Sequence, residues 1–179
     1  MTKDEKIKLI EPTLEYSQQI KAYRKEFLDC GDSMDGTECL RNYDDPKDWI
    51  ERLNSLKDPS NIPSNLVPAT QYIYVREEDD KIVGMIDIRH YLNEYLAKFG
   101  GHIGYSVAPS ERRKGYASQM LGLVLPKCKD LGIEKVLITC TKGNEGSRKT
   151  ILKYGGVYES TVYEKDEDVY LERYWIDLC

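Results

Sequence analysis

The chain has 179 residues, of which 40% are hydrophobic and 32% are charged. This length suits one domain with a real core, and the composition argues against a disordered chain. The net charge of −5 disfavours general binding to nucleic acid, because neutralising phosphates requires an excess of lysine and arginine.

Targeting and metal-binding signals are both weak. No apolar run approaches the roughly 20 residues of a membrane-spanning helix, and the charged stretch from Met1 to Lys8 lacks the apolar centre of a secretory signal. The 5 cysteines have no CxxC spacing and are accompanied by only 2 histidines, so a zinc cluster is not expected. We therefore expect reduced thiols in a cytoplasm, no bound metal and no membrane partner.

The first third of the chain predicts one strand and two helices. Ile7 to Pro12 alternates as a strand does, and apolar residues recur at helical spacing across residues 14–29. A second helix is expected after Asp45-Pro46, since aspartate caps helices and proline suits the first helical position. Three prolines indicate a loop over 58–68. We interpret four acidic residues here as solvated charge or caps, with contact to a cationic substrate as the alternative: Glu38, Asp44, Asp45 and Asp48.

The middle of the chain predicts a hairpin, a short helix and a further strand. Gln71 to Arg76 and Ile82 to Arg89 are rich in strand-forming residues around an acidic turn. Tyr91 to Phe99 has a helix-like pattern closed by two glycines, and His102 to Val107 is strand-like.

The last third alternates helices and strands. Tyr116 to Leu131 predicts a helix that ends at a glycine, and we expect Pro126 to bend it because proline lacks the backbone donor. A strand (135–141), a helix (144–154) and a closing hairpin (157–164 with 169–176) follow. Hairpins mixed with a strand–helix–strand unit predict an α/β fold of mixed α+β type.

The segment from Arg112 to Ala117, RRKGYA, lies between a predicted strand and a predicted helix. A helix N-terminus exposes unpaired N–H groups and the positive end of the helix dipole, so it suits a phosphate. Gly115 permits close approach of the backbone, and Arg112, Arg113 and Lys114 add positive charge. The chain has neither a Walker loop nor a dinucleotide fingerprint. On these residues alone, the segment indicates either a polyanionic ligand or a solvated basic turn.

Arg112-x-x-Gly115-x-Ala117 resembles the Q/R-x-x-G-x-G/A acyl-coenzyme A loop of the GNAT superfamily of N-acetyltransferases. The similarity in order and spacing spans residues about 70–160 and includes GHIGY before the loop, as in a bacterial branch of the superfamily. It implies a twisted, mostly antiparallel sheet of about seven strands with about four helices, splayed at a parallel fourth and fifth strand. The whole chain, 1–179, would form one domain: a variable substrate side (1–68), an acetyl-coenzyme A core (69–160) and a closing hairpin (157–178).

The resemblance implies acetyl-coenzyme A as the co-substrate. The backbone of Val107 would bond the pantetheine arm as an added strand does, Asn144 would contact the same arm, and backbone amides of 113–117 would hold the pyrophosphate. The implied coenzyme-binding residues are Val107, Arg112, Arg113, Lys114, Gly115, Tyr116, Ala117, Ser118, Asn144 and Ser147.

The groups that move protons are harder to assign. Many members of the superfamily place a proton-donating Tyr seven residues after the Asn, where this chain has Ile151. Tyr154 is then a candidate acid, with another group or water as the alternative. An alkyl ammonium has a pKa near 10, so a base must take a proton before or during attack. His102 is the candidate base, with a purely structural hydrogen bond as the alternative, and His90 is a second candidate. Glu94, Asp87 and Tyr105 stay open.

We therefore expect direct acetyl transfer to a primary amine of a small molecule, an amino acid or a protein or peptide, without an acyl-enzyme. Cys140 is interpreted as core packing rather than a nucleophile. The alternatives are a non-catalytic acyl-coenzyme A sensor, favoured by Ile151, and toxin-like acetylation of aminoacyl-tRNA, disfavoured by the lack of a second basic cluster. A homodimer through the closing hairpin (Tyr170, Tyr174 and Trp175) is also considered.

Overall fold

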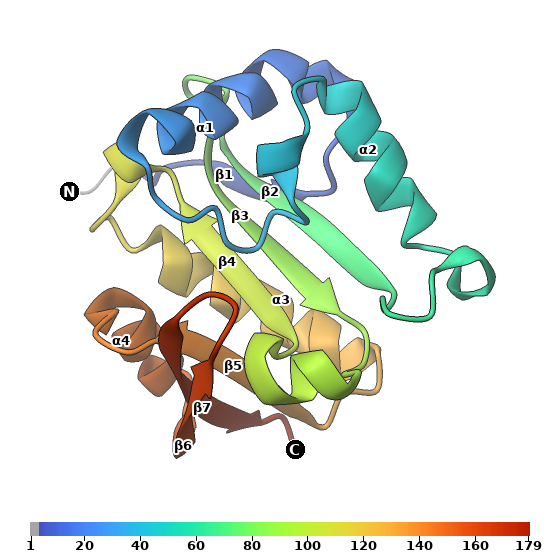
Figure 1. Ribbon diagram of the computed structural model, residues 1–179. Helices are drawn as coiled ribbons and strands as arrows, with labels where there is room; N and C mark the ends of the chain where they lie inside the picture. The colour runs from blue at the N-terminus through green and yellow to red at the C-terminus, as the bar shows by residue number, and fades with distance from the viewer. Residues whose placement is uncertain (1–3) are drawn as a thin grey trace.

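The computed structural model describes residues 4–179, so the first three residues of the charged N-terminal stretch lie outside the described residues. Within that range, seven strands form two antiparallel sheets (Figure 1). The first sheet has the order β1-β2-β3-β4. Its strands are β1 (Ile7–Ile10), β2 (Ala69–Arg76), β3 (Lys81–Arg89) and β4 (Ile103–Val107).

The second sheet is smaller and contains the closing hairpin. Its order is β5-β7-β6, so the last strand lies between the other two. The strands are β5 (Lys135–Thr141), β6 (Val157–Glu164) and β7 (Val169–Asp177). Tyr174 on β7 is 2% exposed and packs in the core, whereas Tyr170 is 56% exposed. The expectation that Tyr174 forms part of an exposed pairing surface is therefore wrong, because its ring faces inward.

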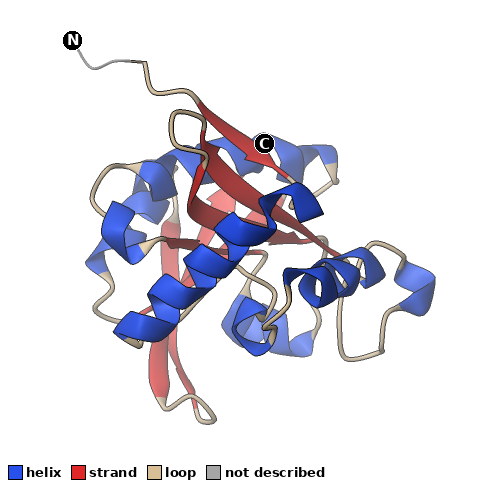
Figure 2. Cartoon of the chain, turned by 90° about the horizontal axis from the view of Figure 1, so that it is seen from above, coloured by secondary structure: helices blue, strands red, loops and turns tan. Residues whose placement is uncertain are grey.

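Four longer helices flank the strands, and Figure 2 shows helices on both sides of them. They are α1 (Ser17–Cys30), α2 (Pro46–Ser55), α3 (Tyr116–Asp130) and α4 (Glu145–Lys153). Asp45 caps α2 as predicted, since its Oδ1 accepts from the Lys47 N–H at 2.9 Å. Helix α3 continues through Pro126 to Asp130. Five short helical turns complete the chain: Leu14–Tyr16, Leu40–Asn42, Pro59–Asn61, Leu96–Gly100 and Pro109–Glu111.

The two faces of the first sheet bury different apolar clusters, as the alternation of strand side chains requires. Ile86 and Ile88 pack with α3 and the second sheet. Ile73 and Met85 pack with α1 and α2. The first sheet is therefore covered on both sides, with α3 and the second sheet on one side and α1 and α2 on the other.

The two sheets meet where β4 and β5 begin. The His102 N–H donates to the Leu137 carbonyl at 2.7 Å. Further along, β4 and β5 line opposite walls of one cavity, and a second cavity separates the end of β4 from α4, so the strands diverge toward their C-terminal ends. The predicted α/β fold and its splayed pair at the fourth and fifth strands are confirmed. The strands divide between two sheets because β4 and β5 separate too soon to form a ladder.

Candidate active site

Two neighbouring cavities occupy the wedge between β4 and β5. The larger, of about 570 Å³, extends to the N-terminal ends of α3 and α4. The smaller, of about 230 Å³, lies between β4, β5 and the loop that follows α1. Both are lined by the same four residues, Asp35, Tyr105, Asn144 and Ser147, so the cavities meet there.

The larger cavity brings together nearly all the residues that the sequence assigned to the coenzyme. Lys114 alone of the ten does not line it, because its Nζ bonds Glu111 Oε2 at 2.7 Å. The nine that do are Val107, Arg112, Arg113, Gly115, Tyr116, Ala117, Ser118, Asn144 and Ser147.

The N-terminus of α3 is open toward this cavity. Gly115 is the residue before the helix, with a left-handed φ of 86°, and no side chain of residues 4–179 caps the helix. Arg113 is also left-handed, with φ of 64°. The backbone N–H groups of the first turn therefore lack side-chain acceptors and suit an anionic group.

Two of the three adjacent basic side chains are held by carboxylates. Arg112 Nη1 bonds Asp32 Oδ2 at 2.7 Å and its guanidinium lies 5.8 Å from the centre of the Phe27 ring. Lys114 is held by Glu111, as described above. The positive charge expected beside the helix start is thus reduced.

Glu111 anchors the segment that precedes α3. It is 5% exposed and pairs with Arg76 at 2.8 Å and with Lys81 at 3.1 Å. The hydrogen bond from Arg76, followed by those from Lys114 and Lys81, lowers the pKa of Glu111 to about 2. This buried network fixes the backbone just before Gly115.

Asn144 and Ser147 form the wall that α4 contributes. Asn144 Oδ1 accepts from the Ser147 N–H at 3.2 Å and so caps α4. The Ser147 hydroxyl lies 2.7 Å from the Tyr105 hydroxyl. Burial raises the pKa of Tyr105, so its hydroxyl stays protonated at the junction of the cavities.

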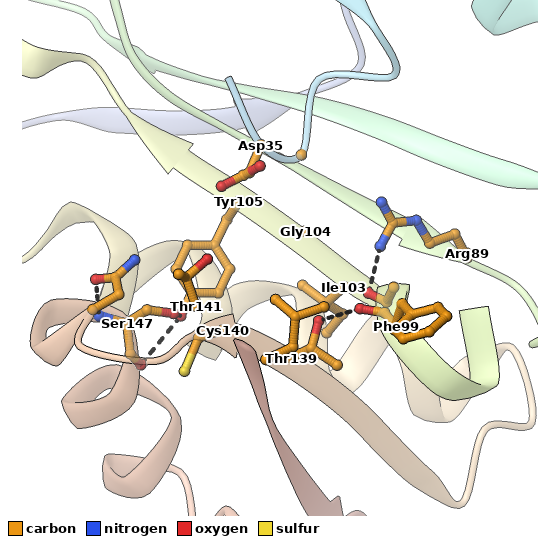
Figure 3. A pocket seen from close by; sticks show the side chains of 14 residues that line it. Asp35, Arg89, Phe99, Ile103, Gly104, Tyr105, Thr139, Cys140, Thr141 and Ser147 are labelled. Carbon is orange, nitrogen blue, oxygen red and sulfur yellow. Dashed lines mark hydrogen bonds between the residues drawn. The ribbon is translucent and has the colours of Figure 1, made fainter. Parts of the chain in front are cut away.

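The smaller cavity has a mixed polar wall (Figure 3). Asp35 lies above Tyr105, and Arg89 approaches from the end of β3. Arg89 Nη1 donates to the Gly100 carbonyl at 3.0 Å, and Thr139 Oγ1 donates to the Phe99 carbonyl at 2.7 Å. These bonds hold the turn at 96–100 against the far wall.

Neither histidine lines a cavity described above. His102 is 7% exposed, and its Nδ1 accepts from the Leu137 N–H at 2.9 Å. Burial, with a smaller effect of Arg89, lowers its pKa to about 4. His90 bonds Thr70 Oγ1 at 2.8 Å through Nε2, and burial lowers its pKa. This geometry matches the structural interpretation of His102 better than the catalytic one.

The candidate acid Tyr154, at the C-terminal end of α4, lines neither cavity. The Tyr154 hydroxyl donates to the Ser118 carbonyl at 2.7 Å and links α4 to α3. Ile151 is fully buried, and Gly156 packs so closely against it that an added Cβ would lie 2.4 Å from its Cγ2. The tight packing around Ile151 leaves little room for a larger side chain, and α4 therefore has no Tyr at the position where many members of the superfamily have one.

Cys140 lines the smaller cavity but lacks the features of a nucleophile. Burial, then the nearby Glu172 carboxylate, raises the pKa of its thiol to about 11. A thiol needs a lowered pKa to attack at neutral pH, so the geometry supports core packing.

Three of the four N-terminal acids behave as surface or capping groups, and one does not. Asp45 caps α2, Asp44 pairs with Arg24 at 2.8 Å, and Asp48 is exposed in the first turn of α2. Glu38 instead lies beside Asp87 and Arg89, and its pKa is raised to about 7, mainly by burial and then by the Asp87 charge. Sequence reasoning left Asp87 open and interpreted Glu38 as solvated charge or a cap, with contact to a cationic substrate as the alternative.

Within residues 4–179, no group of three or more His, Cys, Asp and Glu side chains could hold a metal ion. No helix in the same range combines the length and apolarity needed to cross a membrane.

Comparison with known proteins resolves the family. The model of the Acetyltransferase (GNAT) family matches residues 34–155, which is more than half of the chain. The chain belongs to the GNAT acetyltransferase family. No curated protein matches the sequence.

Solved structures share the fold at low identity. The microcin C7 self-immunity acetyltransferase MccE, in complex with acetyl-CoA and AMP, is 18% identical with a TM-score of 0.67, covering 98% of this chain and 93% of that one. The ribosomal-protein-S5-alanine acetyltransferase of Vibrio fischeri is 16% identical with a TM-score of 0.68, covering 99% and 94%. A dodecameric spermidine N-acetyltransferase of Vibrio cholerae is 13% identical with a TM-score of 0.65, covering 96% and 94%.

Proposed function

We propose that this GNAT protein transfers the acetyl group of acetyl-coenzyme A to a primary amine. The observation that carries the proposal is the meeting of the two cavities at Tyr105 and Ser147. One cavity has the open helix N-terminus that suits a pyrophosphate, and the other is large enough for the amino end of an acceptor. A bound thioester would supply an activated acetyl group at their junction.

The residues of the larger cavity fit the coenzyme. The uncapped first turn of α3, the left-handed Gly115 and the cavity-lining Arg113 provide donors and charge for the pyrophosphate. Val107 and Asn144 lie on opposite walls along the path of the pantetheine arm. A backbone N–H near Val107 would polarise the thioester carbonyl, as oxyanion-binding groups do.

The acceptor cavity suits part of a molecule rather than a whole one. Its volume of about 230 Å³ is below the ~300–1,000 Å³ typical of pockets that enclose drug-sized ligands. Asp35 offers a carboxylate for an ammonium, and Arg89 adds a cation at the far end. The names of related structures include an alanine acceptor on a ribosomal protein and spermidine. We propose a small amine, amino acid or peptide that inserts its amino end.

The proton that the leaving thiolate needs is assigned to Tyr105. Its hydroxyl is protonated, held by Ser147 and placed at the junction of the cavities. Tyr154, the earlier candidate, is committed to the Ser118 carbonyl. Tyr105 therefore takes the role of the proton-donating Tyr that many members of the superfamily have at the position of Ile151.

Two further proposals concern the cellular compartment and the oligomeric state of the protein. All five cysteines are free, which supports a reducing compartment such as the cytoplasm. The hairpin of β6 and β7 exposes Val157 (67%), Tyr158 (52%) and Tyr170 (56%), which supports its use as a homodimer contact.

The test has two stages. Acetyl-coenzyme A should raise the melting temperature in proportion to the logarithm of its concentration, and no shift at millimolar ligand would remove the coenzyme proposal. A screen of amines, amino acids and peptides should then reveal release of the free coenzyme A thiol. Tight binding without release for any acceptor would favour the sensor alternative.

A further inference from the structure

Asp87 is a fully buried carboxylate in the middle of β3. Its Oδ1 accepts from the Gly104 N–H at 3.0 Å, but its Oδ2 has no hydrogen-bond partner in the described chain. The nearest cation, Arg89, places Nη2 3.6 Å from Oδ2. A buried carboxylate that is only half satisfied is costly, so this position needs an explanation.

The residue opposite Asp87 on β2 also has a buried oxygen without a hydrogen-bond partner. Gln71 is the register partner of Asp87, and its Oε1 is also buried without a partner. The orientation of this amide is fixed, because Nε2 donates to the Gly36 carbonyl at 2.8 Å and to the Ile86 carbonyl at 3.2 Å. Two buried acceptors on adjacent strands thus lack a hydrogen-bond donor.

A second carboxyl group is held beside Asp87 by the loop after α1. Gly36 packs so tightly on β4 that an added Cβ would lie 2.3 Å from the Gly104 carbonyl oxygen. Trp49 Nε1 donates to the Thr37 carbonyl at 2.8 Å and pins the next residue. Glu38 follows with a left-handed φ of 47°. The loop is therefore fixed in the conformation that brings the Glu38 carboxyl to Asp87.

The charges around this pair come from three elements. Asp87 and Arg89 approach Glu38 from β3, Arg52 approaches from α2, and Cys39 adjoins it on the loop. Asp35, on the same loop, faces Asp87 and Arg89. Burial and the Asp87 charge raise the pKa of Glu38 to about 7, against the opposing effect of the two arginines. The Glu38 carboxyl group thus takes up a proton near neutral pH.

We propose that Glu38 and Asp87, with no proton between them, act together as the base that deprotonates the acceptor amine and then share the proton that they take up. This inference rests on the proposed acetyl transfer. Arg89, Asp35 and Gly36 line both the smaller cavity and a surface hollow of about 330 Å³ that contains Glu38. Neither carboxyl group of the pair lines the smaller cavity, so the proton crosses this wall by way of Asp35, which lines both cavities and faces Asp87. From Glu38 the proton then leaves to water in the surface hollow.

The proton balance of the reaction is complete with this pair. The Glu38–Asp87 pair forms an O–H bond as an N–H bond of the ammonium breaks, and the electron pair stays on nitrogen. That nitrogen attacks the thioester carbonyl carbon, the carbon–sulfur bond breaks, and the thiolate takes up a proton. The nitrogen loses its second proton as the amide forms, so one proton in total is released to solvent.

The kinetic test is the pH dependence of kcat/KM for Glu38→Gln, with Glu51→Gln as the matched control because Glu51 is an exposed carboxylate on the nearby α2. The wild type should gain activity as pH rises through about 7. Glu38→Gln should lose about 10²- to 10⁴-fold, and its rising limb should move toward the pKa of the free amine near 10. Glu38→Asp should recover part of the rate, and coenzyme affinity should not change.

A second readout does not depend on turnover. Carboxyl carbon NMR of the wild type should show one step near pH 7, and this step should be absent in Glu38→Gln. If no carboxyl titrates near 7, or if Glu38→Gln keeps the wild-type limb, the shared-proton base is wrong. Coenzyme binding and thiol release by the wild type report separately on the proposed function.

Discussion

Across the gap between the two sheets, the His102 ring and the Leu137 backbone form a hydrogen bond in which Nδ1 accepts the N–H at 2.9 Å. A backbone N–H can only donate, so the neutral ring must carry its proton on Nε2. The lone pair that a general base needs is already in use. His102 therefore supports the apex of the wedge in which both cavities lie.

Replacing His102 by alanine should cost stability and leave the chemistry intact. The Leu137 N–H loses its acceptor in a buried site, which should lower the unfolding free energy by about 1–3 kcal/mol. Urea unfolding measures this loss, while thiol release measured per folded molecule should stay within a few fold. A well-folded variant with turnover reduced a hundredfold would restore His102 as the base.

The same histidine predicts a pH window for stability. Its pKa falls from 6.5 in the unfolded chain to about 4 in the fold, so the unfolded state binds the proton first as pH falls. Its contribution is complete above 6.5 and is lost progressively down to about 4. The stability difference between wild type and His102→Ala should therefore shrink over this window. A difference that grows on acidification would contradict the assigned tautomer.

Two glycines at the ends of α3 provide a matched test of coenzyme binding. Gly115 (φ 86°) and Gly132 (φ 80°) are both left-handed, and an added Cβ would meet nothing within 4 Å at either one. Aspartate should strain both positions alike. Only Gly115→Asp places a carboxylate at the anion site, so acetyl-coenzyme A should bind it about 10- to 100-fold more weakly. Thermal shift against ligand concentration checks this, and equal affinities would remove the site.

Arg76 pairs with the buried carboxylate of Glu111 and with the more exposed carboxylates of Asp79 and Glu5, and the buried and exposed partners should differ sharply in their contribution to stability. Glu111→Gln leaves the cluster of Arg76 and Lys81 without its central anion, which should cost about 3–5 kcal/mol and raise the KM for acetyl-coenzyme A. Asp79, whose side chain is 46% exposed, bonds the same Arg76, and Asp79→Asn should cost less than about 1 kcal/mol.

The cluster around Glu111 should also lose stability as pH falls, as His102 does, but for a different reason. Burial disfavours the charged form of His102, whereas hydrogen bonds from cations favour the charged form of Glu111. The Glu111 pKa is lowered to about 2 from 4.5, so its stabilising effect is complete above 4.5 and is lost as pH falls toward 2. Denaturant unfolding between pH 5 and 3 should show a steeper loss for the wild type than for Glu111→Gln. Parallel curves would contradict the network.

Tyr105 and Tyr154 distinguish the proposed acid from a structural hydroxyl. Both hydroxyls are hydrogen-bonded, but only Tyr105 lines the cavities. Tyr105→Phe should lower kcat by about 10²-fold or more with little change in coenzyme affinity. Tyr154→Phe should lower only stability, by about 1 kcal/mol. The reverse result would return the role to α4.

Local patterns predicted most of the fold. Asp45-Pro46 marked the start of α2, and the apolar spacing of 116–131 marked α3. The residues that would line the larger cavity near the start of α3 were also predictable, because they are consecutive in sequence around Gly115. Such features depend on neighbours in sequence, and propensities and caps report on those neighbours.

The acceptor side was harder because its contacts are distant in sequence. Glu38 lies beside Asp87 because the loop is packed at Gly36 against Gly104. No pattern in the sequence around Glu38 predicts that contact. One signal was present: Asp87 is an acidic residue inside the apolar run IVGMIDIR, where an unpaired charge is unfavourable. His102 misled for a similar reason, since its partner Leu137 is on a strand 35 residues away.

The early divergence of β4 from β5 also determines whether the free edge of β4 can pair with a strand of another chain. β4 is the last strand of its sheet, and an unpaired strand edge is a template for pairing with another chain. This edge faces the larger cavity instead of bulk solvent, behind the first turns of α3 and α4. The walls of this cavity therefore also cover the free edge of β4, so that this edge is not offered to a strand of another chain.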